Sequence, residues 1–195
     1  MGRQLPKVLT DEEKVAFLKQ FNTRYPTPHR DLCIVRLMLE AGLRAGETVI
    51  LRPEDLDMMT CRLTVRGKGA KDRGLWINES LRDLIGSWLE RRPGSKWLFP
   101  TRTGERLQTP HLRRMVKQKA RKAGIREPER VSPHTLRHTF ATDIYRETKN
   151  IRLVQKALGH SDLSTTMIYT HIVDDELEEA MKSFVPGPTR VESAR

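Results

Sequence analysis

The stretch SPHTLRHTFATDIYRETKNIRLVQKALGHSDLSTTMIYTH, residues 132–171, carries a His-x-x-Arg pair, then a Gly-His pair, then a single tyrosine. Its opening Ser132-Pro133 predicts a helix start, because a serine side chain caps free backbone amides and proline at the first helical position needs no amide hydrogen. Gly159 predicts the end of a second helix, since glycine follows an apolar segment there. Candidate functional side chains therefore lie on the first helix and just after the second.

His134 and Arg137 are three residues apart, which places both on one face of a helix with about 3.6 residues per turn. Arginine offers a planar fork of donors that fits phosphate oxygens, and an imidazole moves a proton near neutral pH. The pair suits a phosphodiester, although a surface pair on a basic protein has the same pattern. His134 and His138 also have a zinc-ligand spacing, but no glutamate follows His134 directly and no cysteine or acidic cluster is near, which disfavours a metal site.

Tyr169, nine residues after His160, is a candidate nucleophile. A tyrosine hydroxyl has an ordinary pKa of about 10, so it attacks phosphorus only where cations stabilise its anion and the charge that develops on the phosphate. Two arginines and a histidine would supply suitable cations. Considered alone, a tyrosine is more often a half-buried structural residue.

The ordered combination of these motifs resembles the catalytic signature of the tyrosine recombinases, or phage-type integrases, and is similar to the Xer subgroup. The resemblance rests on His134-x-x-Arg137, on Leu158-Gly159-His160 and on Ile168-Tyr169-Thr170-His171. It implies an α+β fold, namely a mainly α-helical catalytic domain with a small antiparallel β-sheet. It also implies a site-specific DNA recombinase that needs no cofactor and no metal.

The composition favours a nucleic-acid partner. The 195 residues include 36 Lys and Arg against 25 Asp and Glu, a formal net charge of +11, which predicts a polyanionic partner such as DNA. The most apolar run, residues 32–39, is interrupted by Arg36, so we expect no membrane span and a cytoplasmic, nucleoid-associated protein. Cys33 and Cys61 predict free thiols in a reducing compartment.

Caps and hydrophobic periodicity predict the remaining elements. Thr10 and Glu13 form a capping-box pattern that opens a helix, and a loop containing Pro26 and Pro28 is expected after it. Thr109 is the expected cap of another helix, whose first residue is proline. Further helices are expected over 29–41 and 79–91, and strands over 62–66 and 73–77, on either side of a glycine-containing turn at 67–72.

The catalytic domain is expected to span residues 10–184, between an N-terminal tail at 1–9 and a C-terminal tail at 185–195. Most members of the resembling family carry a separate N-terminal DNA-binding domain ahead of the catalytic one. An excised catalytic domain and a naturally short member of the family are both compatible with this sequence, and the choice between them stays open.

Two further positions acquire a role through the resemblance. By its sequence alone, Arg44 is either a solvated surface arginine or a ligand-binding one, and Lys68, between two glycines, lies either in a charged hairpin tip or close to DNA. The resemblance assigns Arg44, followed by Glu47, to the family's first arginine and Lys68 to its general acid. Gly46 departs from the family pattern, which has a hydroxyl residue there, and weakens the prediction of a helix start.

Basic side chains outside this signature are expected to bind DNA phosphates. Between residues 111 and 130, eight Lys or Arg face two Glu, although a solubilising charged surface has the same composition. The predicted contacts are Lys71 and Arg73 near the hairpin turn, and Arg113, Arg114, Lys117 and Arg121 on the helix that begins near Thr109.

The resemblance also implies a mechanism. Tyr169 attacks the scissile phosphate to give a 3′-phosphotyrosyl link and a free 5′-hydroxyl, and Lys68 protonates the leaving 5′-oxygen. Two arginines hold the nonbridging oxygens, while two histidines hydrogen-bond the phosphate and assist proton transfer. The expected catalytic residues are Arg44, Lys68, His134, Arg137, His160 and Tyr169.

The expected partner is double-stranded DNA that carries recombination sites. Residues 174–184 combine an acidic start with an apolar stripe, and in the resembling family the segment after the nucleophile docks on a neighbouring subunit. We therefore expect a homo-tetramer on synapsed DNA and a monomer without DNA. The target sequence and the outcome (integration, excision, inversion or dimer resolution) stay open. The alternatives are a binding-only regulator with the same fold and a topoisomerase-IB-like relaxing enzyme.

Overall fold

The computed structural model describes residues 6–67, 72–159 and 182. The chain divides into two units, Met1–Gly159 and His160–Arg195, and Lys182 is the described residue of the second. Within the described residues, no helix has both the length and the apolar character that crossing a membrane requires. The expected limits of the catalytic domain, 10 and 184, stay a prediction.

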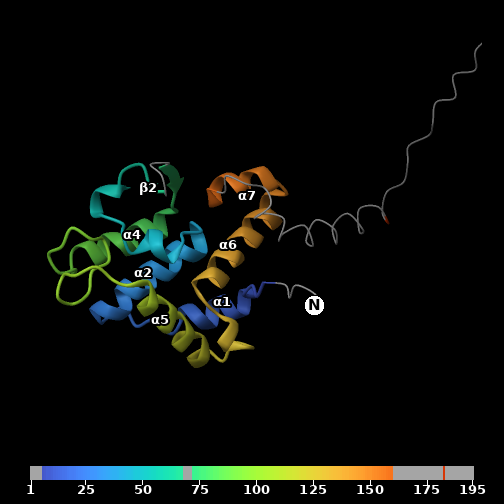
Figure 1. Ribbon diagram of the computed structural model, residues 1–195, viewed down its shortest axis with the longest axis horizontal. Helices are drawn as coiled ribbons and strands as arrows, with labels where there is room; N and C mark the ends of the chain where they lie inside the picture. Colours follow the sequence, from blue (N-terminus) through green and yellow to red (C-terminus); the bar gives the residue numbers. More distant parts are fainter. Residues whose placement is uncertain (1–5, 68–71, 160–181, 183–195) are drawn as a thin grey trace, which may run out of the picture. The chain divides into compact units, whose positions relative to one another are not determined.

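The described part of the first unit is mainly helical (Figure 1). Its strands form one antiparallel sheet in the order β1-β2-β3, so the predicted α+β class with a small antiparallel sheet is confirmed. The α-helices are α1 (Asp11–Leu18), α2 (Pro26–Glu40), α3 (Ala45–Thr48), α4 (Glu79–Leu89), α5 (Thr109–Lys122), α6 (Pro133–Thr148) and α7 (Ile151–Leu158). The 3₁₀ helices are η1 (Pro53–Asp55) and η2 (Pro128–Arg130), and the strands are β1 (Leu56–Asp57), β2 (Arg62–Val65) and β3 (Arg73–Trp76).

Two helix starts follow the capping chemistry of the sequence. The Thr10 hydroxyl accepts a hydrogen bond from the Glu13 amide, and the Glu13 carboxylate accepts one from the Thr10 amide, which forms the predicted capping box of α1. Ser132 caps α6 as predicted, with Thr135 as its partner and Pro133 in the first turn. Both helices begin there because the caps satisfy amides that the helix itself leaves free.

Two other helix starts correct the prediction. Pro26 and Pro28, expected in a loop, lie in the first turn of α2. Proline fits there because first-turn amides have no acceptor within the helix. Helix α5 begins at Thr109 itself, and Gln108 takes the N-cap position without a side-chain hydrogen bond. A proline that follows a polar residue thus marks the helix start in both cases.

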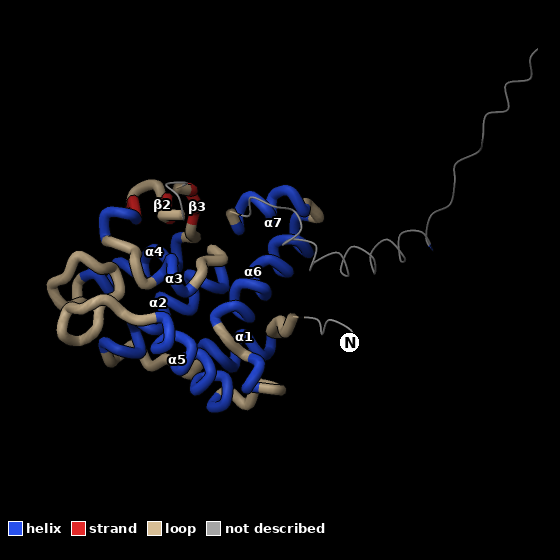
Figure 2. Tube along the Cα trace, in the orientation of Figure 1, coloured by secondary structure: helices blue, strands red, loops and turns tan. Residues whose placement is uncertain are grey.

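Helix α2 supplies a large part of the core. It packs against both α4 and α6, and Figure 2 shows it among the helices below the sheet. Its side chains Ile34, Leu37 and Met38 are fully buried. Burial of each side chain of this size contributes about 1.5–3 kcal/mol relative to leaving it exposed. The segment that follows α2 is therefore attached to a firmly packed helix.

The sheet is short and is buried on one side. Strand β2 pairs with β3 so that Leu63 faces Leu75 and Val65 faces Arg73, and the three apolar members of these pairs are buried. The predicted strands β2 and β3 are confirmed. Strand β1 was not predicted, because two residues show no hydrophobic period.

Two glycines end helices with left-handed backbone, and the helix end at Gly159 was predicted. Gly42 follows α2 with a φ of 65°, and Gly159 follows α7 with a φ of 62°. A Cβ atom on Gly42 would overlap the ring of Phe140 from α6, and a Cβ on Gly159 would lie 2.8 Å from Cδ of Arg73. Both positions therefore need glycine for its conformation and for its small size.

Replacing Gly42 by alanine is expected to lower the free energy of unfolding by about 2–5 kcal/mol. The left-handed conformation costs roughly 1–2 kcal/mol for an L side chain, and overpacking against the ring costs about 1–3 kcal/mol. Urea unfolding followed by circular dichroism measures the difference. Gly46→Ala is the matched control, because no atom lies within 4 Å of its Cβ position. A Gly42→Ala protein as stable as the wild type would contradict this packing.

Candidate active site

The predicted catalytic residues fall into a described and an undescribed group. Arg44, His134 and Arg137 belong to the described part of the chain. Within that part, no three His, Cys, Asp or Glu side chains are grouped as a metal ion requires. The predicted site residues that lie outside the described ones are Lys68, Lys71, His160 and Tyr169.

Arg44 is the N-cap residue of α3. Its Nη1 donates to Oε1 of Glu47 at 2.9 Å, and its backbone N–H donates to Oε2 of Glu47 at 2.8 Å. The Arg44 side chain is 40% exposed, so the guanidinium is anchored while part of it is accessible to a ligand. The helix start that Gly46 made uncertain is present, since α3 begins at Ala45.

Glu47 is the carboxylate on which the cations of this region converge. Its two oxygens accept hydrogen bonds from Arg73 at 2.8 and 2.9 Å, and Nη1 of Arg137 lies 3.9 Å from Oε2. Burial raises the pKa of Glu47, but the hydrogen bonds from Arg73 and from Arg44 outweigh it and lower the pKa to about 2. Glu47 is therefore ionised at neutral pH and links β3 with α3 and α6. The sequence identified it only as part of the Arg44 motif.

Arg137 points from α6 into the protein, and its side chain is 7% exposed. Its Nη1 donates to the carbonyl oxygen of Gly42, and its Nη2 donates to that of Leu158 at 2.6 Å. Carbonyl groups at helix ends have no donor within the helix, so Arg137 satisfies groups that would otherwise need water. The alternative of an exposed surface arginine is wrong for Arg137. Its guanidinium instead joins the segments that follow α2 and end α7.

His134 lies in the first turn of α6, at an exposed position. Although the residue as a whole is exposed, its imidazole is partly desolvated, which lowers the pKa of His134, and the positive charges of Arg113, Arg137 and Arg44 lower it further. Cationic groups from α5, α6 and the start of α3 therefore share one electrostatic environment. A bound anion would reverse this effect, because a negative charge beside the imidazole favours its protonated form.

Helix α5 has the predicted division into an apolar and a basic face. Arg113 and Arg114 are exposed. Lys117 and Arg121 instead form ion pairs with Glu129 of η2, at 2.5 and 2.6 Å. Exposed ion pairs contribute about 0–1 kcal/mol, so these two cations can exchange Glu129 for a phosphate at little cost. The buried residues of the other face are Leu112, Met115, Val116 and Ala120.

A basic cluster that the sequence did not single out surrounds the indole ring of Trp97. The charged groups of Arg52, Lys96 and Arg106 lie 5.9, 5.0 and 5.8 Å from the ring centre, and we call these three cations the Trp97 cluster. Arg52 lies 3.6 Å from a carboxylate of Glu54. Among the described residues, neither Lys96 nor Arg106 forms an ion pair. Only the adjacency of Lys96 and Trp97 is visible in the sequence.

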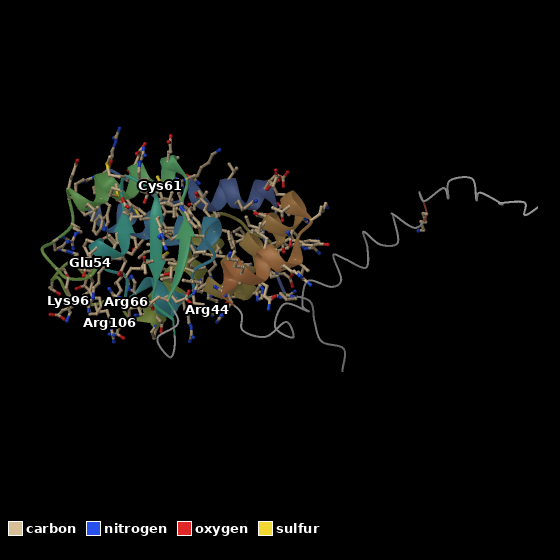
Figure 3. The ribbon with its side chains drawn as sticks, turned by 90° about the horizontal axis from the view of Figure 1, so that it is seen from above. Arg44, Glu54, Cys61, Arg66, Lys96 and Arg106 are labelled. Atoms are coloured by element: carbon tan, nitrogen blue, oxygen red, sulfur yellow. The ribbon has the colours of Figure 1, made fainter. Side chains whose placement is uncertain are left out.

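Two cations of the Trp97 cluster, Lys96 and Arg106, lie on the same side as Arg44 in the view of Figure 3. In Figure 3, Lys96, Arg106, Arg66 and Arg44 follow one another along the lower edge of the view. Three cations around one ring repel each other, and an anion with several oxygens relieves that repulsion. This side is therefore a candidate surface for a polyanion.

The chain has clear relatives among known proteins. Residues 7–176 match the Phage integrase family, and the chain belongs to this family. Tyrosine recombinase XerD of Pseudomonas putida is 36% identical over 187 residues, which cover 92% of this chain and 62% of the relative. Tyrosine recombinase XerA of Thermococcus kodakarensis is 40% identical over 185 residues, which cover 92% and 63%. The chain thus spans less than two thirds of the length of these curated relatives.

Solved structures show the same fold. The crystal structure of XerA recombinase has a TM-score of 0.81 at 31% sequence identity, over 96% of this chain and 68% of that one. XerH site-specific recombinase, in a post-cleavage complex with a palindromic difH substrate, has a TM-score of 0.80 at 30% identity, over 92% of this chain and 54% of that one. The resemblance to tyrosine recombinases of the Xer subgroup, inferred from residues 132–171, is confirmed.

Proposed function

We propose that this domain breaks and rejoins DNA strands through a tyrosine that becomes linked to a 3′-phosphate. The convergence of Arg44 and Arg137 near the Glu47 carboxylate carries the proposal, because it brings guanidinium groups from distant parts of the chain to one place. Two such groups suit the two nonbridging oxygens of one phosphodiester. XerH, which has the same fold, is a site-specific recombinase bound to its difH substrate, and this supports the same substrate class.

In the proposed reaction, the Tyr169 oxygen forms a bond to phosphorus while the bond from phosphorus to the 5′-oxygen breaks. The phenolic proton passes to His134 or His160, and Lys68 gives a proton to the leaving 5′-oxygen. The arginines stabilise the negative charge that develops on the pentacoordinate phosphate. A 5′-hydroxyl then attacks the phosphotyrosyl bond and reverses these steps, so the reaction consumes no cofactor.

We further propose that the chain acts in the cytoplasm as a homo-tetramer on two synapsed DNA duplexes. Residues 174–184, which lie outside the described ones except for Lys182, would dock on the neighbouring subunit through their apolar stripe. The acidic start of this segment supports a protein contact over a DNA contact, because five of the six residues from Asp174 to Glu179 carry negative charge.

Covalent trapping tests the proposed chemistry. The protein is incubated with nicked suicide duplexes, first with the palindromic difH site and then with other candidate sites, and the products are separated on a denaturing gel. We expect a protease-sensitive adduct on the 3′ side of the cleaved strand. The contrary result would be a protein that binds these duplexes but forms no adduct, even after any further domain or partner has been added. That result would favour a binding-only regulator over this proposal.

The Trp97 cluster is expected to bind the DNA backbone beside the cleavage site. The double substitution Lys96→Gln and Arg106→Gln should weaken duplex binding and lower the slope of log affinity against log salt by about 1.8, because each phosphate contact contributes about 0.9. Neither side chain has an ion-pair partner among the described residues, so the fold should not change. Fluorescence anisotropy over a salt series measures the slope.

The control for this double substitution removes two charges elsewhere. Lys19→Gln with Arg24→Gln changes exposed cations at the end of α1 and in the loop after it. We expect this control to keep the wild-type slope. Equal slopes for both double variants would exclude the Trp97 cluster from the DNA contact surface.

A further inference from the structure

Arg73 does not occupy the exposed, phosphate-binding position that its charge led us to expect. The sequence assigned it to a DNA phosphate, but its side chain is 14% exposed and both of its terminal nitrogens donate to Glu47. Its Nε is buried and has no hydrogen-bond acceptor among the residues that the structure describes. The guanidinium therefore faces the interior carboxylate, and its two-bond pair is made with Glu47 and not with a phosphate at the surface.

Arg73 also touches the end of α7. A Cβ atom on Gly159 would lie 2.8 Å from Cδ and 3.1 Å from Nε of Arg73, so the side chain packs directly on the backbone of this glycine. Gly159 follows Leu158, whose carbonyl accepts a hydrogen bond from Arg137, and it comes directly before His160. Arg73 thus contacts both the Glu47 carboxylate and the backbone of Gly159, which comes directly before the predicted catalytic residue His160.

We propose that Arg73 is a positioning residue, which fixes the Glu47 carboxylate and, through it, the Arg44 guanidinium relative to the β2–β3 hairpin. Arg73 is the first residue of β3 and pairs with Val65 at the end of β2. Lys68, the predicted general acid, belongs to the segment between these two strands. Arg73 therefore connects the strands that flank the predicted proton donor to the residue that holds the first arginine. This inference rests on the proposed function.

The geometry requires an arginine at this position. Two parallel N–H···O bonds fix both the distance and the plane of the Glu47 carboxylate, whereas a lysine ammonium offers a single point of attachment. With lysine, one carboxylate oxygen keeps only its bond from Arg44, so the carboxylate is held less rigidly. Arg44 would then lose its fixed orientation while the net charge of the site stays the same.

The first test compares Arg73→Lys with the wild type in two assays. The rate of adduct formation on the suicide duplex should fall by at least about tenfold, because a displacement of about 1 Å in a catalytic group costs up to about 10²-fold. The salt dependence of duplex binding should not change. Because lysine keeps the charge, the phosphate contact itself is tested with Arg73→Gln: a slope lowered by about 0.9 in that variant would show a direct phosphate contact and would overturn the proposal.

The matched control is Arg36→Lys. Arg36 forms an equivalent two-bond pair with Glu40 on α2, and among the described residues its remaining side-chain hydrogen bond goes to Ser80 and not to Arg44, Glu47 or Arg137. Arg36→Lys should therefore keep the adduct rate and the salt dependence of the wild type. An equal loss of rate in both variants would show that Arg73 has a merely structural role.

The second test asks whether Arg73 acts through Glu47. In a Glu47→Gln background, Arg73→Lys should cause no further loss of rate, because the carboxylate that it positions is gone. The same fold-loss in both backgrounds would overturn the proposal. A wild-type protein that forms no adduct on DNA that it binds would refute the proposed function, whereas an Arg73→Lys protein that cleaves at the wild-type rate refutes only this inference.

The pH dependence supplies a readout that a structural role would not change. In the described part of the chain, the charged groups that face Glu47 are Arg44 at the start of α3, Arg73 on β3 and Arg137 on α6. In Arg73→Gln the carboxylate stays buried but loses the strongest of its stabilising bonds, so the pKa of Glu47 should rise. The acid limb of the cleavage rate should therefore move to higher pH. An unchanged acid limb would contradict the role of Arg73.

Discussion

Replacing Tyr169 by phenylalanine is expected to abolish the covalent protein–DNA adduct, with a loss of more than about 10⁴-fold in the rate of strand cleavage. Phenylalanine removes the single oxygen that forms the bond to phosphorus and leaves the size of the side chain nearly unchanged. Binding to the duplex should stay within about twofold of the wild type, because DNA affinity comes mainly from cations on phosphates. Denaturing gels measure the adduct, and anisotropy measures the affinity.

The other tyrosines give this experiment a complete set of controls. The sequence contains three tyrosines, and the other two are Tyr25 and Tyr145. Tyr25 is 63% exposed before α2, and Tyr145 is buried on α6. Tyr25→Phe and Tyr145→Phe should both keep the adduct. If Tyr169→Phe also kept it, another residue would be the nucleophile and the assignment of Tyr169 would be wrong.

The parts of the fold that the sequence predicted are those with short-range causes. The capping box of Thr10, the Ser132-Pro133 start of α6 and the glycine at the end of α7 depend on residues within a few positions of one another. The chemistry of a cap or of a left-handed residue is visible in a single short segment. The ordered motifs between residues 132 and 171 also lie within one short stretch of sequence, and they were sufficient to identify the family.

The parts that the sequence missed depend on contacts between distant segments. Arg73 and Glu47 are separated by 26 positions, and no local pattern shows that they pair. Arg73 was assigned to DNA because charge alone does not tell a buried ion pair from a phosphate contact. The partnership of Lys117 with Glu129 depends in the same way on η2 returning along α5. Tertiary packing, which periodicity does not encode, decides which cations are free.

The different roles of Arg44 and Arg137 can also be seen only in the structure. Sequence motifs treat Arg44 and Arg137 as equivalent clamps for one phosphate. In the structure Arg44 is 40% exposed, whereas Arg137 is nearly buried and bonded to two backbone carbonyls. Arg137 therefore has a role in stability that Arg44 lacks, and this difference can be measured without DNA.

Replacing Arg137 by alanine is expected to lower the free energy of unfolding by about 3–5 kcal/mol, because it leaves buried carbonyls and part of the Glu47 charge without a partner. Domains of this size are stable by about 5–15 kcal/mol, so the variant should be close to unfolding. Urea unfolding in the absence of DNA measures this loss. Arg113→Ala, at an exposed position of α5, is the control and should keep the wild-type stability.

Arg137→Lys separates the stability of the fold from the chemistry. A lysine keeps the positive charge and can reach one of the two carbonyls, so it should recover part of the stability that alanine loses. Its single ammonium group cannot bond both carbonyls and also donate to a phosphate oxygen, so adduct formation should stay about 10²–10³-fold below the wild type, the scale of losing one charge-stabilising donor. A lysine variant that cleaves normally would show that Arg137 acts only as a structural bond between the ends of α2 and α7. A different result would contradict the buried contacts described for this side chain: Arg137→Ala loses cleavage activity but unfolds at the same urea concentration as the wild type.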